Sequence, residues 1–255
     1  MTRYSSADFG FLTIGQYNLT AVTTKLTETQ AREPVPSTPY GVTAPEFLPG
    51  IMRSYEMAAS DGWYDDATNS MNAAMVDLTA GENVMLISSY GNSAPATGVG
   101  KTVTATDGVQ KTKYTRDDAV GDYVRANFEV VVSGAVDINA KLVAELVARD
   151  DAATTAATYL NWGADGAAGG RMYLVVTDIT WDTQTSLTIA LQDCNTSDGA
   201  YADHTTFTAI ASPATGGSEM KILEHDAIQQ YTCATFTFAG GAGGHCTAAV
   251  AVVYD

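Results

Sequence analysis

The last third of the chain repeats one pattern, in which a short run rich in Thr, Val and aromatic residues is followed by a turn-forming cluster. β-Branched and aromatic side chains favour strands, whereas Asp, Asn, Ser and Gly favour tight turns. Runs this short, at hairpin spacing, predict an antiparallel β-sandwich. The six runs cover 172–179, 186–192, 205–210, 220–223, 230–238 and 246–254.

The first part of the chain carries the same β signal less regularly. Residues 137–148 fit a helix by one spacing and a strand by another, and we favour a strand because the surrounding pattern is β. We therefore predict a protein that is mainly β throughout. Further strands are expected at 16–24, 51–58, 83–90, 101–106, 109–115 and 122–132.

One segment has clear helical spacing and an apolar stripe. Asp61 or Asp65 is expected to cap its start, with acidic residues in the first turn, where the helix dipole favours them. Gly81 is expected to end it. The stripe consists of Ala67, Met71, Ala74, Met75 and Leu78.

Two other segments predict how the chain is divided. Residues 31–50 contain five of the seven prolines, and proline is excluded from helix interiors and central strands, so we expect an extended surface arm there. Residues 149–170 are dominated by glycine and small residues, which is typical of a boundary. We expect a first β-sandwich domain with its helix over 1–160, and an immunoglobulin-like antiparallel lobe over 161–255.

Asp107-Gly108 lies between two β-rich runs, which predicts a long hairpin over 101–116. Two interpretations of its positive charge stay open: a solvated hairpin, or a contact that docks onto an acidic copy of the same chain. The basic residues are Lys101, Lys111, Lys113 and Arg116.

The formal net charge is −16. Residues 1–150 contribute 18 acidic and 11 basic side chains, and residues 151–255 contribute 11 acidic and 2 basic ones. Such a surface repels nucleic acid phosphates and anionic membranes, although solubility alone also explains it. We see no signal peptide and no apolar run of the roughly 18 residues that a membrane span needs.

Two apparent ligand motifs fail on inspection. The sequence GVGKT resembles the end of a phosphate-binding loop, but Pro95 stands where that motif needs its first glycine. A β-branched run follows Lys101, so no helix is expected there to hold a phosphate. The turn at 193–199 is not a calcium loop, because His204 stands where that loop needs Glu.

The remaining reactive residues predict no chemistry. The three histidines are scattered, and Cys194, Cys233 and Cys246 form no C-x-x-C pair. We expect reduced thiols, and a single disulfide stays open as an alternative. The sequence predicts no metal, no cofactor and no catalytic site.

The order of segments resembles that of the major tail tube proteins of long, flexible-tailed, siphovirus-type bacteriophages. The resemblance covers most of the chain, and the segments that carry it include GQYNLTAVTT, GIMRSYEMAASDGWYDDA, KLVAELV and IQQYTCATFTFAGG. It implies a tube-type β-sandwich braced by one helix, assembled as homohexameric rings that stack into a hollow tube. The arm (31–50) and the hairpin (101–116) would reach neighbouring subunits and rings.

The function that this resemblance implies is structural, not enzymatic. The chain would form the virion tail tube that conducts DNA during ejection, with DNA as non-adhering cargo. Its partners would be other copies of itself and the tape measure, terminator and distal tail proteins, assembled in the cytoplasm of the bacterial host. The alternative is a virion decoration or receptor-recognition module whose C-terminal lobe contacts a glycan.

Overall fold

The computed structural model describes residues 9–32, 35–36, 47–48, 53–64, 70–79, 85–90, 101–106, 109–118, 123–132, 135–150, 159–163, 168–197 and 199–254. Over these residues the protein is mainly β with one helix, α1 (Met71–Thr79), as the sequence predicts. The strands form three larger sheets and one two-stranded pair, and all the pairings are antiparallel.

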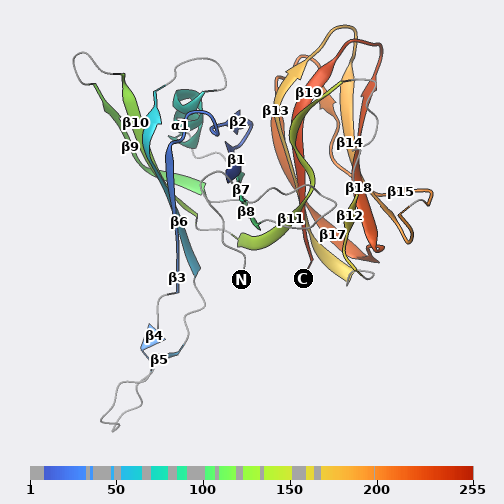
Figure 1. Cartoon of the computed structure of the whole chain (residues 1–255), viewed down its shortest axis with the longest axis horizontal. Coiled ribbons are helices and arrows are strands. Elements are labelled where there is room, and N and C mark those ends of the chain that lie inside the picture. Colours follow the sequence, from blue (N-terminus) through green and yellow to red (C-terminus); the bar gives the residue numbers. More distant parts are fainter. Residues whose placement is uncertain are drawn as a thin grey trace.

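The strands stack in four layers, which lie from left to right in Figure 1. The first layer is the outer N-terminal sheet, the middle two are the halves of one eight-stranded sheet, here called the long sheet, and the fourth is the outer C-terminal sheet. The outer N-terminal sheet has the order β3 (Lys25–Arg32), β6 (Arg53–Trp63), β10 (Arg125–Val132), β9 (Val109–Asp117).

The long sheet begins in the C-terminal part of the fold and ends in the N-terminal part. Its order is β17 (Gly217–Ala227), β13 (Ala168–Thr180), β19 (His245–Tyr254), β11 (Ala135–Asp150), β8 (Lys101–Thr106), β7 (Leu86–Tyr90), β1 (Phe9–Ile14), β2 (Tyr17–Asn18). The outer C-terminal sheet has the order β12 (Leu160–Asn161), β18 (Tyr231–Ala239), β14 (Ser186–Cys194), β15 (Ala202–Thr206), and β16 (Ile210–Ala211) also pairs with β14.

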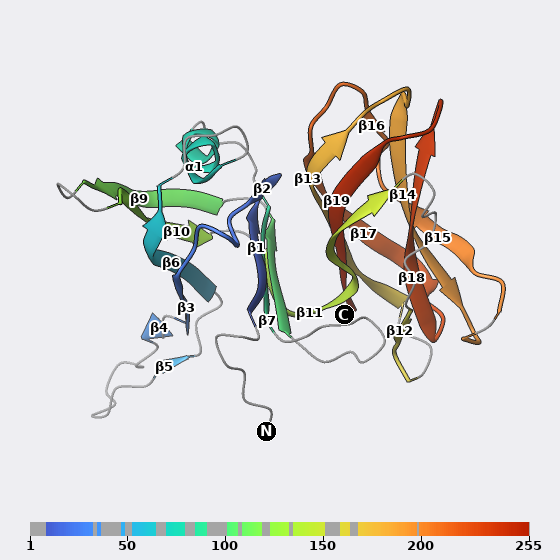
Figure 2. The ribbon, with the colours of Figure 1, turned by 45° about the horizontal axis from the view of Figure 1, so that its top comes forward.

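Both faces of the long sheet are buried, so the four layers enclose three apolar cores. Alternate residues of a strand point to opposite faces. In β13, Leu174 packs towards the outer C-terminal sheet, whereas Tyr173 and Val175 pack between the two halves of the long sheet. In β1, Leu12 packs towards the outer N-terminal sheet and Phe11 packs between the halves. The lobes therefore share an apolar middle core, and Figure 2 shows them side by side.

Strand β11 runs through both lobes. Its first part, from Ala135 to Ala140, pairs with β8, and its second part, from Lys141 to Asp150, pairs with β19. Irregular register between residues 137 and 147 accompanies this change of partner. Residues 141–150, which the sequence analysis assigned to the first domain, thus belong by pairing to the C-terminal half of the long sheet. The strand that we favoured for 137–148 is confirmed.

An ion pair joins the two parts of the long sheet beside the middle core. Arg171 of β13 donates to both oxygens of Asp137 of β11, with Nε–Oδ2 at 2.7 Å and an Nη–Oδ1 distance of 2.8 Å. Tyr173 also donates its hydroxyl to Asp137. Burial raises the pKa of Asp137, but the bonds from Arg171 and Tyr173 outweigh this and hold the pKa below its ordinary value. The carboxylate is therefore kept charged.

The start of the helix differs from the prediction. Helix α1 begins at Met71, where the amide of Ala74 donates to the carbonyl of Ser70 at 3.0 Å. The first turn holds no acidic residue, so that expectation is wrong. Asp65, Ala67 and Gly81 lie outside the described residues. The other members of the apolar stripe are buried as predicted: Met71, Ala74, Met75 and Leu78.

Asp61 is a bulge residue of β6 and not a helix cap. Its φ is 57°, in the left-handed region that Asp tolerates better than most residues. Its amide donates to the Asn127 side chain at 2.7 Å, opposite an irregularity in the β6–β10 register. A Cβ on the next residue, Gly62, would lie 2.7 Å from the Val22 carbonyl oxygen, so this position requires glycine.

The hairpin predicted over 101–116 is wrong, although both of its strands exist. Strand β8 pairs with β7 and β11 in the long sheet, and β9 pairs with β10 in the outer N-terminal sheet. The chain thus passes from one layer to another between them. The local turn signal indicated where β8 ends, but it held no information about which strand pairs with it.

Other differences are smaller. The strand expected over 16–24 reduces to β2 at Tyr17–Asn18, followed by turns. The two-residue strand β12 lies inside the glycine-rich segment that we interpreted as a boundary. The six C-terminal runs all contain strands, with the run at 205–210 divided between β15 and β16.

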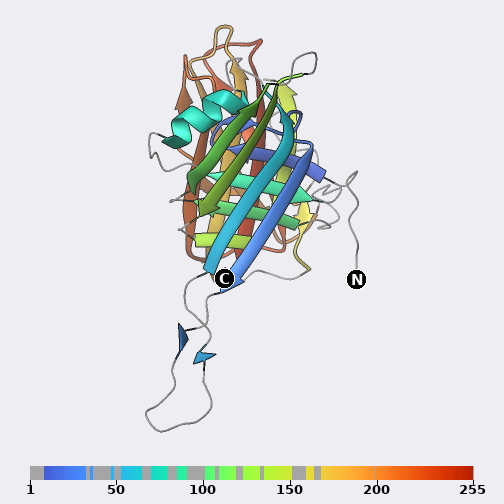
Figure 3. The same ribbon diagram turned by 90° about the vertical axis from the view of Figure 1, so that its left-hand side faces the viewer.

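Part of the proline-rich arm is described. β4 (Val35–Pro36) and β5 (Phe47–Leu48) pair with each other and lie beyond the ends of β3 and β6, away from the body of the fold (Figures 1 and 3). The backbone there is extended, as the prolines require. The rest of residues 31–50, apart from the end of β3, lies outside the described residues.

Candidate assembly surfaces

The four basic residues of interest do not gather into one cluster. Lys101 lies in β8 of the long sheet, in register with Tyr90 of β7. Lys111, Lys113 and Arg116 lie on β9 in the outer N-terminal sheet. The structure therefore separates the first residue from the other three.

The three basic side chains of β9 already contact groups of their own chain. Lys111 donates to the carbonyl of Met75 in α1 at 2.8 Å, so it links the sheet to the helix. Lys113 pairs with Glu129 at 3.2 Å. Arg116 pairs with Asp118 at 3.2 Å, and its guanidinium carbon lies 5.4 Å from the centre of the Tyr64 ring. A docking role would have to compete with these contacts.

The sharper feature of this lobe is the pair of long edges of its outer sheet. Strand β3 has 8 residues and β9 has 9, and they lie at opposite ends of the order β3-β6-β10-β9. Within the described part of the chain, no strand pairs with the outer side of either one. Long edges present rows of backbone donors and acceptors that can pair with another chain.

One face of this sheet packs inward and the other is open. The inward face contributes Tyr55, Met57 and Phe128 to the core with the helix. The opposite face points away from the other layers and towards the viewer in Figure 3. Its described charged side chains are Lys25, Lys113, Arg125, Glu56, Glu129 and Asp117, placed there by register.

This open face carries a nearly balanced charge. Three of the charged side chains placed by register are basic and three are acidic, and Lys113 pairs directly with Glu129. At the bulge, Asp61 adds a fourth acidic group, 3.7 Å from Arg125. We expected the strong negative charge of the protein to keep DNA from adhering, but the acidic groups described on this face exceed the basic ones by only one.

Exposed apolar side chains gather at the end of the outer N-terminal sheet where β6 stops and β10 begins. Trp63 is 45% exposed and Tyr123 is 69% exposed, and their rings meet edge to face with centroids 4.7 Å apart. Val124, beside them in sequence, is 36% exposed. Exposed aromatic residues of this kind are enriched at protein interfaces. The proline-rich arm leaves the opposite end of the same sheet (Figure 1).

The described residues contain no metal cluster, and two of the cysteine thiols are held in the protonated form. No group of three or more His, Cys, Asp or Glu side chains among them could hold a metal ion. The three cysteines are free and buried. Burial raises the pKa of Cys233 and of Cys246 to about 11, so both thiols are protonated at neutral pH.

No helix among the residues that the structure describes is long and apolar enough to span a membrane.

Sequence reasoning missed two parts of this arrangement. The open edges depend on which strands fail to pair, and a single sequence holds little information on that. The Asp137–Arg171 pair joins residues 34 positions apart in the chain. The one available signal was that Arg171 and Lys221 are the only basic residues after position 150.

Comparison with known proteins gives partial structural resemblance. No protein-family model and no curated protein sequence matches the chain. The tail of an empty gene transfer agent particle, described with C6 symmetry, covers 54% of this chain and 99% of its own at 15% identity and a TM-score of 0.41. A chain from the virion of a native gene transfer agent particle covers 54% of this chain and 99% of its own, at 14% identity and a TM-score of 0.42.

A third structure resembles the chain over nearly its whole length. The SPP1 Dit protein, described as a paradigm of the hub adsorption apparatus in phages that infect Gram-positive bacteria, covers 95% of this chain and 97% of its own. The identity is 11% and the TM-score is 0.30. Values this low assign neither a family nor a function to the chain.

Proposed function

We propose that the protein is a structural component of a phage tail, which polymerises as stacked hexameric rings into the tube that conducts DNA during ejection. The observation that carries this proposal is the outer N-terminal sheet, which has a long open edge on each side. The proposed role is architectural and not enzymatic. Its place is the virion tail, assembled in the cytoplasm of the bacterial host.

Strand direction is compatible with closure into a ring. Each neighbouring pair in the order β3-β6-β10-β9 is antiparallel, so β9 runs opposite to β3. Strand β9 of one copy can then pair with β3 of the next and continue the antiparallel pattern. A contact between two different surfaces closes into a ring when its rotation allows. Closure would also remove both edges, which otherwise invite aggregation.

The size of such a ring is adequate for a channel. Six copies, each contributing four strands, would exceed the roughly 16–18 strands at which barrels already enclose an aqueous lumen. The open face of the sheet would line that lumen. Its nearly balanced charge offers no basic stripe of the kind that holds nucleic acid phosphates. DNA would therefore pass as non-adhering cargo.

Stacking of the rings would use the two ends of the same sheet. The proline-rich arm extends from one end, and Trp63 with Tyr123 is exposed at the other. Contacts between opposite ends of a subunit repeat along an axis and produce a filament. The tape measure, terminator and distal tail proteins are the further partners we propose for the ends of that filament.

Negative-stain microscopy of the purified protein tests the proposal. Hollow tubes, or six-fold rings that stack at high concentration, are the expected result. Single rings that never stack would overturn the tube while keeping a ring-forming role, as in a hub at one end of a tail. A folded monomer at every concentration would overturn both.

A further inference from the structure

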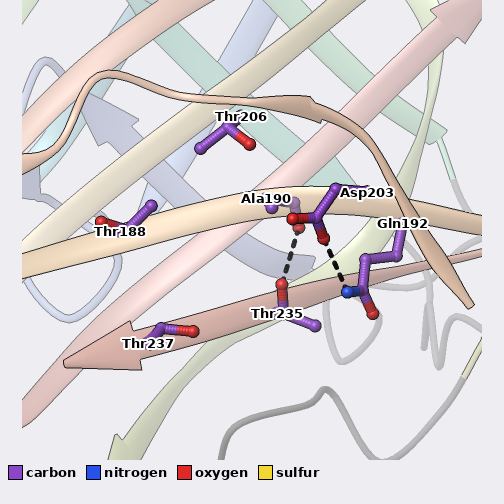
Figure 4. Close-up of a pocket in the computed structure, with 7 residues that line it drawn as sticks. All are labelled: Thr188, Ala190, Gln192, Asp203, Thr206, Thr235 and Thr237. Atoms are coloured by element: carbon purple, nitrogen blue, oxygen red, sulfur yellow. Dashed lines mark hydrogen bonds between the residues drawn. The ribbon is translucent and has the colours of Figure 1, made fainter. Parts of the chain in front are cut away.

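The outer C-terminal sheet bears a hollow on the face that points away from the rest of the molecule. Its volume is about 460 Å³, within the range of about 300–1,000 Å³ that is usual for small-molecule sites. Figure 4 shows its lining, drawn from β14, β15 and β18. The lining residues are Thr188, Ala190, Gln192, Asp203, Thr206, Thr235 and Thr237.

The strand register explains why a hollow forms there. Ala190 lies between Thr206 on β15 and Thr235 on β18, so the smallest side chain of the lining occupies its middle row. Gln192 and Asp203 oppose each other in the next row. The irregular register between Leu191 and Gln192 bends β15 at this point. Larger side chains therefore surround a floor made by one methyl group.

The strand that forms one wall is held in place from beneath. His204, on the inner side of β15, lies with Nδ1 3.3 Å from Oδ2 of Asp193. The same carboxylate oxygen accepts a hydrogen bond from the backbone amide of Gln229, with the two atoms 3.0 Å apart. Both side chains of the pair are nearly buried, at 11% and 7% exposed. This support positions the neighbouring Asp203 on the outer side.

The lining is rich in hydrogen-bonding groups and poor in charge. The threonine hydroxyls can donate and accept, except that Thr235 already donates to the carbonyl of Ala190 at 3.5 Å and offers its oxygen as an acceptor (Figure 4). Gln192 donates to Asp203 at 2.7 Å. That bond leaves the second carboxylate oxygen of Asp203 as an acceptor, whereas the amide oxygen of Gln192 already accepts from the Cys233 thiol at 3.9 Å and keeps one further lone pair. Asp203 is the one ionisable residue of the lining. Acceptors and hydroxyls beside one negative charge suit a ligand with many hydroxyl groups and disfavour an anion.

An aromatic residue lies on the same face of β18, one alternate position beyond Cys233 and outside the lining. Tyr231 follows in the alternation of β18, two residues before Cys233, and its ring meets that of Tyr159 edge to face at 5.2 Å. Burial, followed by the Cys233 and Cys194 thiols, raises the pKa of Tyr201 to about 12. An apolar face beside placed polar groups is the usual build of a small-ligand site.

We propose that this hollow binds a neutral oligosaccharide. Its hydroxyl groups would bond to Asp203, Gln192 and the threonines, and the apolar face of a second sugar ring would lie towards Tyr231. An anionic glycan is disfavoured by Asp203 and by the 11 acidic against 2 basic side chains in residues 151–255. The outer C-terminal sheet is the layer farthest from the outer N-terminal sheet (Figure 1), so the site does not depend on the proposed ring.

The test is a glycan array of neutral and sialylated oligosaccharides probed with the full-length protein, followed by calorimetric titration of the best neutral ligand. Asp203→Asn and Thr235→Val should each lower its affinity about tenfold, the usual cost of one lost hydrogen bond in a binding site. Thr180→Val, an exposed threonine on β13 of the other sheet, is the matched control and should leave affinity unchanged.

Several outcomes would overturn the site. The first is that the array shows no binding to any neutral glycan, and the second is that it shows a preference for sialylated glycans. The third is that the Thr180→Val control loses as much affinity as the variants of the hollow. Thermal unfolding of each variant must match the parent, because a misfolded lobe would lower affinity without bearing on the hollow. Microscopy of the same variants separates this proposal from the assembly proposal, since both Asp203→Asn and Thr235→Val should leave assembly intact.

Discussion

The two outer sheets of the molecule are both antiparallel, but their edge strands differ in length. The outer N-terminal sheet ends in strands of 8 and 9 residues. The outer C-terminal sheet ends in β12 with 2 residues and in β15 with 5, beside β16 with 2. Very short edge strands are a common way to prevent pairing with other chains. The outer N-terminal sheet is thus suited to pair with a copy of itself, whereas the outer C-terminal sheet is not; the long edge of the C-terminal lobe is β17, with 11 residues, at the end of the long sheet.

The largest expected effect comes from proline in edge strand β3. Adjacent residues of an edge strand direct their N–H groups alternately towards the neighbouring strand and away from it. We compare Thr29→Pro with Gln30→Pro. In one of these two variants the lost N–H group faced β6, so that variant should unfold more easily than the parent. The other should stay folded but fail to assemble, as seen by thermal unfolding and microscopy.

The same pair of changes in the other lobe is the control. Of Thr205→Pro and Thr206→Pro in β15, the variant that remains folded should assemble like the parent. Normal tubes from both β3 variants would contradict the role of this edge.

The next effect concerns how strongly the two lobes are joined. Arg171→Ala leaves the Asp137 carboxylate, whose side chain is 10% exposed, without its cation. Loss of one partner of a largely buried pair costs about 3 kcal/mol of unfolding free energy. Arg116→Ala removes a pair whose side chains are both 53% exposed, and solvent screening should leave the unfolding midpoint close to that of the parent. Denaturant titration of both variants measures the difference, and equal midpoints would contradict it.

A smaller effect should appear in acid. Against the effect of burial, the bonds from Arg171 and Tyr173 hold the folded pKa of Asp137 below the ordinary value for an aspartate. Its contribution to stability is therefore present above the unfolded pKa and is lost as pH falls through the folded one. Asp137→Asn should lower stability at neutral pH and flatten the loss of stability below about pH 4. Thermal unfolding of parent and variant from about pH 2 to about pH 7 measures this pH dependence of stability. A parallel pH profile for parent and variant would exclude the linkage.

The smallest effect should come from the charge balance of the open face. Glu129→Lys removes an acidic group and the partner of Lys113, and should produce weak DNA binding at low salt that vanishes at physiological salt. Asp178 is an exposed residue of β13, and Asp178→Lys is the matched charge change in the other lobe. Tubes assembled from this variant should bind less DNA than tubes assembled from Glu129→Lys. Fluorescence anisotropy with a short duplex measures both. Equal binding by the two variants would mean that total charge, and not this face, governs adhesion.

The sequence predicted the strands well and their partners poorly. Alternation and turn residues are local, so the C-terminal runs and the strand at 137–148 were found. Pairing is not local: Asp107-Gly108 has the composition of a hairpin turn, yet β8 and β9 join different sheets. Asp61 misled for a related reason, because Asp is favoured both at helix starts and in left-handed bulges. The basic residues of β9 were identified, but not their contacts with Met75, Glu129 and Asp118.

Strand β11 has a mechanical consequence. It is hydrogen-bonded to β8 in one lobe and to β19 in the other, with the covalent chain continuous between them. A pull applied to the C-terminal lobe along this strand loads many of its hydrogen bonds at once in shear, because they lie across the direction of the force. A hinge made of a flexible linker would instead extend before it transmitted any load. The second lobe is in this way rigidly attached to the first, and a force on its outer surface is transmitted to the outer N-terminal sheet.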